Sequence, residues 1–356
     1  MQVLAVLRMT RVLLTGGCGF IGHHIVEHLL KNTDWKIVVL DRLDYASDGF
    51  DRLRDIEAFD DKRVSVYTWE LTQPIPNFLD KEIGKCDYVI HIAAGSHVDN
   101  SITDPVKFIQ DNVNSTLTML EYARKVMPKK FIYFSTDEVY GTAPEGIDFK
   151  EGDRFNPGNP YSASKAASEC ICMAYSNTYK IPIQITNTMN VLGERQHPEK
   201  YLPRIIRAVM QAQKLTIHAN KEKTKAGQRH YIHARNVADA LLHIMVFVDE
   251  FLDNVDATKG RFNIVGEKEF DNLELAKFVA NYLKLPLHYE MVDFHSCRPG
   301  HDLRYALSGE KLERLGWKHP VSIETSIKRI VDWSLKTENS KWIFSEEKLI
   351  NKVTDN

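Results

Sequence analysis

Two residues four apart, Tyr161 and Lys165, could move a proton to or from a hydroxyl group. They lie in the run Asn-Pro-Tyr-Ser-Ala-Ser-Lys at 159–165, which predicts the start of a helix with both side chains on one face. A phenol with a pKa of about 10 is a poor base at neutral pH, but a neighbouring ammonium group favours the phenolate. The pair could therefore accept the proton of an alcohol as it is oxidised. Taken alone, this spacing is more often an ordinary pair on a helix surface.

A glycine-rich turn supplies a second signal. Residues 12–14 predict a strand, Gly17, Gly19 and Gly22 then satisfy G-x-G-x-x-G, and an amphipathic segment follows. Glycines are needed there because backbone N–H groups at a helix N-terminus must approach a pyrophosphate closely. Asp41 ends the next predicted strand about 20 residues later, where an acid can bind a ribose 2′-hydroxyl. The pattern predicts an NAD site, since Asp41 would repel the 2′-phosphate of NADP, although the adjacent Arg42 works against that preference.

Two adjacent acids, Asp137 and Glu138, follow another predicted strand. Neighbouring acids at a strand end usually mark a solvated loop. In doubly wound folds, however, ligands bind at the carboxyl ends of the strands, where these acids would lie. Burial and mutual repulsion could separate their two pKa values, so that one serves as an acid and the other as a base.

Strands and helices must alternate to position these residues. Short β-rich runs lie at 11–14, 36–40, 63–67, 88–92, 130–134 and 183–186. With helical segments between them, they predict an α/β fold with a Rossmann-type doubly wound parallel sheet. We expect an NAD-binding domain at 9–188 and a smaller, interleaved C-terminal substrate-binding region at 189–340, with some of its elements returning to the main sheet. Two apolar stripes of helical period are predicted to face a core: Ile109, Val113, Leu117 and Leu120, and Val237, Leu241, Ile244 and Val248.

Composition excludes several classes of protein. The 356 residues hold 46 Lys and Arg against 48 Asp and Glu, so no basic excess points to a nucleic-acid partner. The apolar stretch 241–248 is too short for a membrane span of about 20 residues. The five cysteines have no zinc or redox spacing, and we expect reduced thiols in a cytoplasmic protein without a metal. Residues 1–8 lack the features of a secretory signal and are left outside the predicted fold.

Together these motifs resemble the extended short-chain dehydrogenase/reductase superfamily of nucleotide-sugar-modifying enzymes, from about residue 10 to 333. The run Phe-Ser-Thr-Asp-Glu-Val-Tyr-Gly at 134–141 resembles the signature of dTDP-glucose 4,6-dehydratases. Epimerases and decarboxylases of the superfamily usually carry Ser or Thr at the position of Asp137. Further blocks that match lie at 93–99, 193–200, 229–233 and 298–305.

The resemblance implies a three-step reaction on a nucleotide-diphosphate hexose. Tyr161 would take the carbon-4 hydroxyl proton while a hydride passes to NAD, with Lys165 holding the phenolate and Thr136 donating to the developing ketone. Glu138 would remove the carbon-5 proton, and protonated Asp137 would donate to the departing carbon-6 hydroxyl. The hydride then returns to carbon 6, which gives a 4-keto-6-deoxy sugar nucleotide and water.

The resemblance also implies the remaining contacts and the assembly. Cofactor contacts would be Gly16, Gly19, Phe20, Ile21, Gly22, Asp41, Ala93, Tyr161 and Lys165. Substrate contacts would be Ser96, His97, Asn190, Glu199, Lys200, Arg229, Asn263, Arg298 and His301, with the two arginines on the diphosphate. A homodimer would form through the segments 108–126 and 161–179.

Some choices stay open at this stage. Asn100, Asn187, Leu192 and Glu70 depart from the family pattern, so the nucleotide base and the hexose are undecided between dTDP-glucose, UDP-glucose and others. An NAD-dependent nucleotide-sugar epimerase or UDP-glucuronate decarboxylase of the same fold is one alternative, although it needs no acid/base pair at 137 and 138. A non-catalytic NAD-binding regulator is another. Damage at Thr136, Tyr161 or Lys165 would favour it, and all three are intact.

Overall fold

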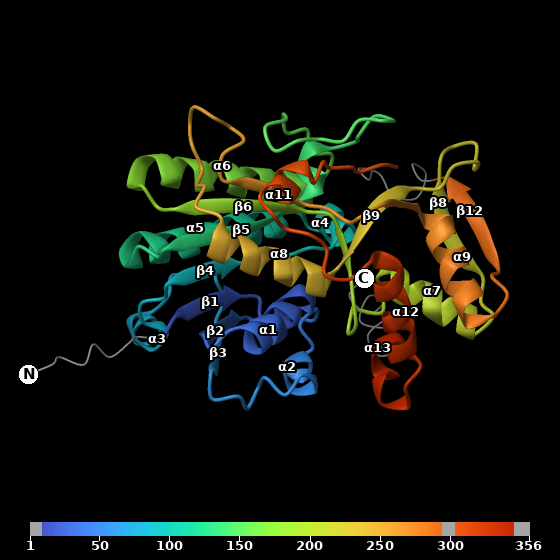
Figure 1. Cartoon of the computed structure of the whole chain (residues 1–356), viewed down its shortest axis with the longest axis horizontal. Helices are drawn as coiled ribbons and strands as arrows, with labels where there is room; N and C mark the ends of the chain where they lie inside the picture. Colours follow the sequence, from blue (N-terminus) through green and yellow to red (C-terminus); the bar gives the residue numbers. More distant parts are fainter. Residues whose placement is uncertain (1–8, 294–302, 345–356) are drawn as a thin grey trace, which may run out of the picture.

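The computed structural model describes residues 9–293 and 303–344, and a seven-stranded sheet lies at the centre of these residues (Figure 1). Its strands are β1 (Arg11–Thr15), β2 (Lys36–Asp41), β3 (Val64–Thr68), β4 (Tyr88–His91), β5 (Lys130–Thr136), β6 (Ile183–Thr188) and β10 (Arg261–Ile264). Their order is β10-β6-β5-β4-β1-β2-β3, and all neighbours are parallel. The order reverses at β1, between β2 and β4, so the predicted doubly wound parallel sheet is confirmed.

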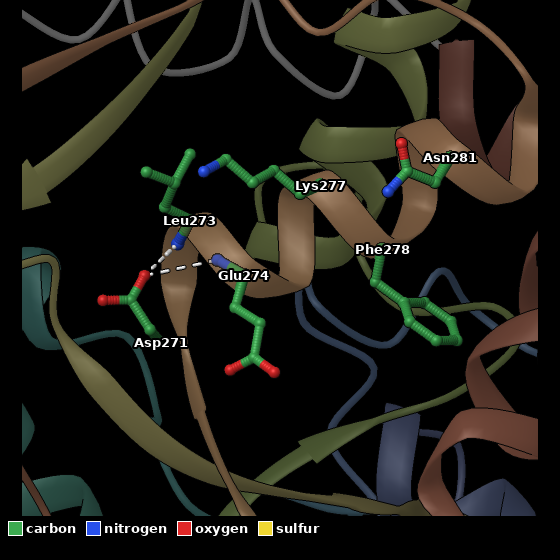
Figure 2. Close-up of a pocket in the computed structure, with 6 residues that line it drawn as sticks. All are labelled: Asp271, Leu273, Glu274, Lys277, Phe278 and Asn281. Carbon is green, nitrogen blue, oxygen red and sulfur yellow. Dashed lines mark hydrogen bonds between the residues drawn. The ribbon is translucent and has the colours of Figure 1, made fainter.

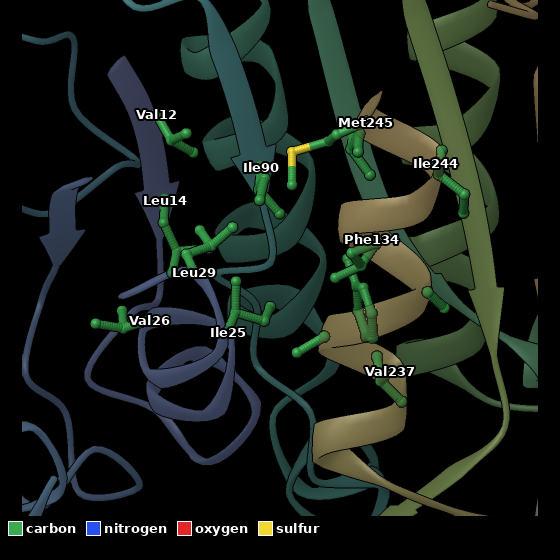
Figure 3. Packing of buried hydrophobic residues seen from close by; sticks show 14 of the residues in the cluster. Val12, Leu14, Ile25, Val26, Leu29, Ile90, Phe134, Val237, Ile244 and Met245 are labelled. Carbon is green, nitrogen blue, oxygen red and sulfur yellow. The ribbon is translucent and has the colours of Figure 1, made fainter. Parts of the chain in front are cut away.

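Helices cover both faces of this sheet, because parallel strands are buried on both sides. The helices α1 (Phe20–Asn32) and α8 (Ala234–Phe247) pack on one face, against Val12 and Leu14 of β1 (Figure 3). On the other face, α5 (Pro105–Val126) and α6 (Pro160–Tyr179) share a core with Leu13. Shorter elements of this half are α2 (Asp51–Asp55), α3 (Asn77–Ile83), α4 (Val98–Thr103) and the 3-10 turn η1 (Asp137–Tyr140).

The two predicted apolar stripes have different outcomes. All four stripe residues of α8 and its C-terminal end are buried, as predicted. In α5, however, Ile109 and Leu117 are 43% and 40% exposed, so the prediction that they face the core is wrong. The helix instead turns small polar side chains toward α6, where the Asn112 amide donates to Ser164 Oγ at 2.8 Å. The apolar face that α5 does bury is formed by Met119, Leu120 and Tyr122, and Ile109 and Leu117 lie outside it.

A second group of elements lies at one end of the main sheet (Figure 1). The strand β9 (Gln228–His233) pairs in parallel with β7 (Asn190–Leu192) and antiparallel with β11 (Glu269–Asp271), while β8 (Leu215–Ala219) pairs with β12 (Tyr289–Asp293). Around them lie α7 (Tyr201–Met210), α9 (Asn272–Leu283), α12 (Ile323–Ser334), η2 (Thr337–Asn339) and α13 (Lys341–Phe344), whereas α11 (Glu310–Arg314) packs on the main sheet beside β10. Because α8 and β10 join the main sheet, the chain interleaves its two halves. We keep 9–188 and 189–340 as a proposed division.

Most of the predicted strands end later than the sequence indicates, although β4 ends one residue earlier, at His91. β5 and β6 continue past their apolar residues because Ser135 pairs with Asn187 and Thr136 with Thr188. Polar groups are thereby carried to the carboxyl edge of the sheet. The charged run 221–225, between β8 and β9, is exposed. In the part of the chain that the structure describes, no helix has both the length and the apolar character needed to cross a membrane.

Candidate active site

The glycine-rich turn joins β1 to α1 and leaves space for an anion. Gly16 has a φ of 71°, in the left-handed region, and its N–H donates to Leu40 O at 2.9 Å. A Cβ at Gly22 would lie 2.1 Å from the Gly16 carbonyl oxygen, so a side chain there would break the turn. Gly19 precedes Phe20 and Ile21, and no side chain caps the first N–H groups of α1. These donors and the positive end of the helix fit a pyrophosphate.

Asp41 ends β2 beside this turn. Its carboxylate accepts the N–H of Cys18 at 3.0 Å and the N–H of Leu43 at 2.9 Å. Burial raises the pKa of this carboxyl, while the two N–H groups oppose the rise. The neighbouring Arg42, which weakened the preference for NAD, is held by carboxylates, including Asp111 at 2.9 Å and Glu70 at 3.2 Å. Its charge is therefore compensated next to the proposed ribose position.

The loop after β4 borders the same turn. The Ala93 N–H donates to Thr15 Oγ at 3.2 Å, which ties the ends of β1 and β4 together. Ser96 is exposed further along this loop, and His97 is the N-cap of α4. The predicted cofactor contacts of β1, α1, β2 and the loop after β4 thus lie at the carboxyl ends of the strands where the strand order reverses.

Tyr161 and Lys165 come from the first turns of α6. Asn159 caps this helix in a reciprocal capping box with Ser162. The Lys165 ammonium is buried and donates to the carbonyl of Phe134 at 2.7 Å, so the helix is tied to β5. Burial lowers the pKa of Lys165 to about 8. Burial, with Glu138 adding to it, raises the pKa of Tyr161, while a hydrogen bond with Thr136 opposes the rise.

The two adjacent acids occupy different environments. Asp137 is 5% exposed, and its Oδ1 accepts a hydrogen bond from the Thr136 hydroxyl at 3.0 Å, whereas Glu138 is half-buried. Burial, and then the charge of Glu138, raises the pKa of Asp137 to about 7, although Arg229 opposes the rise. Within the described residues, no donor reaches Asp137 Oδ2. A pKa of about 7 leaves part of the Asp137 population protonated at neutral pH.

Four of the residues predicted to contact substrate, Arg229, His97, Glu199 and Lys200, have polar or charged neighbours in the described chain. Arg229 of β9 donates to Leu303 O at 2.8 Å, and its guanidinium lies 4.5 Å from the Tyr305 ring. The Arg229 charge lowers the pKa of Asp137, so Arg229 lies near the two acids. His97 Nε2 lies 3.4 Å from Glu199 Oε1, and Lys200 Nζ lies 3.7 Å from the same oxygen, which joins α4 to the residues before α7.

The other predicted contacts are placed differently. Asn190 is exposed at the start of β7. Asn263 is fully buried in β10, and its amide donates to Phe149 O and Ser308 O, each at 3.2 Å. This side chain therefore holds two loops in place. Arg298 and His301 lie outside the described residues.

Sequence reasoning missed a buried ion pair below the site. The Glu169 carboxylate is fully buried, forms an ion pair with Arg261 of β10, and accepts the Ser135 hydroxyl at 2.5 Å and the Asn187 amide at 2.8 Å. Glu169 follows Lys165 by four residues, so helical spacing from Tyr161 would have drawn attention to it. The pair joins α6 to β5, β6 and β10.

A surface hollow of about 460 Å³ lies over α9, and none of its lining residues belongs to the predicted site (Figure 2). Asp271 at its edge caps α9 by accepting the N–H groups of Leu273 and Glu274, at 2.7 and 3.3 Å. The Asp271 carboxylate therefore has a structural role as the N-cap of α9.

Comparisons with known proteins agree with this arrangement. The family model described as GDP-mannose 4,6 dehydratase matches residues 13–330. A dTDP-D-glucose 4,6-dehydratase from Mus musculus is 34% identical, over 95% of this chain and 92% of its own length. The structure of a dTDP-glucose 4,6-dehydratase from Streptomyces venezuelae, solved with NAD bound, has a TM-score of 0.81 and 31% identity, and covers 94% of this chain and 99% of its own. A Thermus thermophilus UDP-glucose 4-epimerase complexed with NAD has a TM-score of 0.78 and 28% identity, over 91% and 98% of the two chains. The resemblance found in the sequence is thus confirmed, and the chain belongs to the GDP-mannose 4,6-dehydratase family of extended short-chain dehydrogenases/reductases, with dTDP-glucose 4,6-dehydratases among its close relatives.

Proposed function

We propose that this protein is an NAD-dependent nucleotide-sugar 4,6-dehydratase, a hydro-lyase that converts dTDP-glucose or UDP-glucose to the 4-keto-6-deoxy sugar nucleotide and water. The observation that carries the proposal is the pairing of Asp137, whose pKa is raised to about 7, with the adjacent Glu138, next to Tyr161. An elimination needs one group that gives a proton and one that takes a proton on the same substrate.

The residues around the glycine-rich turn fit NAD. The first N–H groups of α1, which no side chain caps, would bind a pyrophosphate beside the glycine turn, and Asp41 would accept the ribose hydroxyls. Relatives of the same fold were solved with NAD bound. Bound NAD would take a hydride from carbon 4 and later return it to carbon 6.

Tyr161 and Thr136 would act first. As carbon 4 is oxidised, the Tyr161 phenolate takes the proton of its hydroxyl, and the Thr136 hydroxyl donates to the developing ketone. The raised pKa of Tyr161 keeps it protonated until positive charge is brought close. Lys165, which is buried one helical turn away, would supply that charge.

The acids would act second. A ketone at carbon 4 makes the carbon-5 proton acidic, and Glu138 removes it. Protonated Asp137 donates to the carbon-6 hydroxyl, the C–O bond breaks, and water leaves. Reduction at carbon 6 and return of the proton from Glu138 to carbon 5 complete the product, so no net oxidation takes place.

The substrate contacts, the oligomeric state and the location in the cell are further proposals. Ser96, His97, Asn190, Glu199, Lys200, Arg229, Asn263, Arg298 and His301 remain our proposed substrate contacts. We also propose a homodimer and a cytoplasmic location. The described cysteines at 18, 86, 170 and 172 are free thiols, which suits a reducing compartment.

Mass spectrometry of the purified protein tests the function. The protein is incubated with NAD and, in separate reactions, dTDP-glucose, UDP-glucose, GDP-mannose, CDP-glucose and UDP-glucuronate. We expect one substrate to lose one water without net formation of NADH. Loss of carbon dioxide from the glucuronate would indicate a decarboxylase, and an unchanged mass with altered chromatographic mobility an epimerase. No change with any sugar would favour a non-catalytic NAD-binding protein.

A further inference from the structure

The Asn159 side chain contacts Glu138, the proposed base of the elimination, and the start of the helix that carries Tyr161, the proposed base of the oxidation. Its side-chain oxygen accepts the Ser162 N–H at 2.9 Å and so caps α6, the helix that carries Tyr161. Its side-chain amide donates to Glu138 Oε2 at 3.1 Å. Asn159 is only 6% exposed, so these bonds form with little competition from water.

The two bonds fix the side chain in one orientation. The Ser162 N–H can be accepted only by the oxygen of Asn159, which turns the nitrogen toward Glu138. A second side chain, Tyr305, places its hydroxyl 3.5 Å from the same Oε2, and the guanidinium of Arg229 lies over the Tyr305 ring. Oε2 is therefore occupied by protein donors. Oε1 is the oxygen left for a proton from a ligand.

We propose that Asn159 is a positioning residue for Glu138. By holding Oε2, Asn159 turns Oε1 toward the carbon-5 proton. Because Asn159 also caps α6, it fixes the position of the Glu138 carboxylate relative to Tyr161. The reaction rests on the proposed function, whereas the orientation of Glu138 rests on the two hydrogen bonds of Asn159. Since a proton must pass between atoms about 3 Å apart, a freely rotating carboxylate would spend much of its time in unproductive positions.

Three substitutions separate this role from helix capping. Asn159→Ser keeps a good N-cap but loses the amide donor, and Asn159→Asp keeps the cap while replacing the donor by a second charge beside Glu138. Asn159→Ala loses both. We expect the melting temperature to stay near the wild-type value for Asn159→Ser and to fall for Asn159→Ala and Asn159→Asp, for the latter because two carboxylates repel each other. The rate of water loss should fall by about tenfold or more for all three. Because oxidation at carbon 4 remains possible, reduced-cofactor absorbance should accumulate on Asn159→Ser when substrate is added.

A readout that does not depend on activity completes the test. In crystals of Asn159→Ser, we expect the Glu138 carboxylate to leave its wild-type position or to occupy two orientations. An unmoved carboxylate, or a wild-type rate in Asn159→Ser with a loss only in Asn159→Ala, would overturn the inference. If the wild-type protein converts no sugar nucleotide, the proposed function fails, and the Glu138 orientation in the crystals still decides whether Asn159 positions it.

Discussion

Asp137 is nearly buried beside Glu138, and its titration should be visible in the stability of the protein. Burial, with the charge of Glu138 adding to it, raises its pKa from 3.8 to about 7. Between these pH values the folded protein holds a proton that the unfolded chain has released, so the contribution of Asp137 to stability falls as the pH rises from about 4 to about 7. We expect the free energy of unfolding of the wild type to decline over this window relative to Asp137→Asn, whose amide does not titrate. Denaturant unfolding without cofactor at several pH values measures it, and a difference independent of pH would contradict the raised pKa.

The roles of Glu138 and Tyr161 can be separated by the step at which a variant of each residue stops the reaction. Glu138→Gln keeps the shape of the side chain but cannot take the carbon-5 proton, so we expect reduced-cofactor absorbance to persist after substrate is added and water loss to fall by about 10² or more. Tyr161→Phe is the matched control, because it should stop the oxidation and give no such absorbance. Water loss at the wild-type rate in Glu138→Gln would mean that another group is the base.

At the scale of elements, the buried pair Glu169–Arg261 fastens α6 to the sheet below the site. Removing one partner leaves an uncompensated buried charge, so we expect Arg261→Met to cost about 3–5 kcal/mol of unfolding free energy. The double variant Glu169→Gln/Arg261→Met should be more stable than Arg261→Met, since the amide oxygen can still accept from Ser135 and Asn187. Denaturant unfolding of both singles and the double gives the coupling energy, and simple additivity would show that the charges do not interact.

The sequence is informative about local structure and much less so about long-range partners. The strands of the first half and the starts of α1 and α6 follow from apolar runs, glycines and caps within a few residues, and the structure has them. The partner of Glu169 lies 92 residues away on a strand that joins the edge of the sheet, and no local pattern names Arg261. The burial of Asn263 likewise depends on loops at Phe149 and Ser308, far from it in sequence. Composition cannot settle which face of α5 is buried, because small polar residues make that contact.

At the scale of the whole molecule, α5 leaves an apolar surface without cover in the described chain. Val106, Ile109 and Leu117 of α5 are 64%, 43% and 40% exposed. The neighbouring helix α6 is joined to α5 by a hydrogen bond of 2.7 Å from Tyr175 to Glu121. Several large apolar side chains that share one helix surface are costly to leave in water and are typical of an interface. This surface supports the proposed homodimer.

Sedimentation velocity tests the homodimer directly. We expect the wild type to sediment as a dimer at micromolar concentration, and Ile109→Lys/Leu117→Lys to sediment as a monomer, because burying two charges without partners would cost more than the apolar contact contributes. Phe247→Lys is the control: this residue is 73% exposed at the end of α8, the helix on the opposite face of the sheet, so the dimer should persist. A monomeric wild type, or dissociation by Phe247→Lys alone, would move the interface away from α5 and α6. An intact fold in the double variant, checked by its melting temperature, ensures that only assembly has changed.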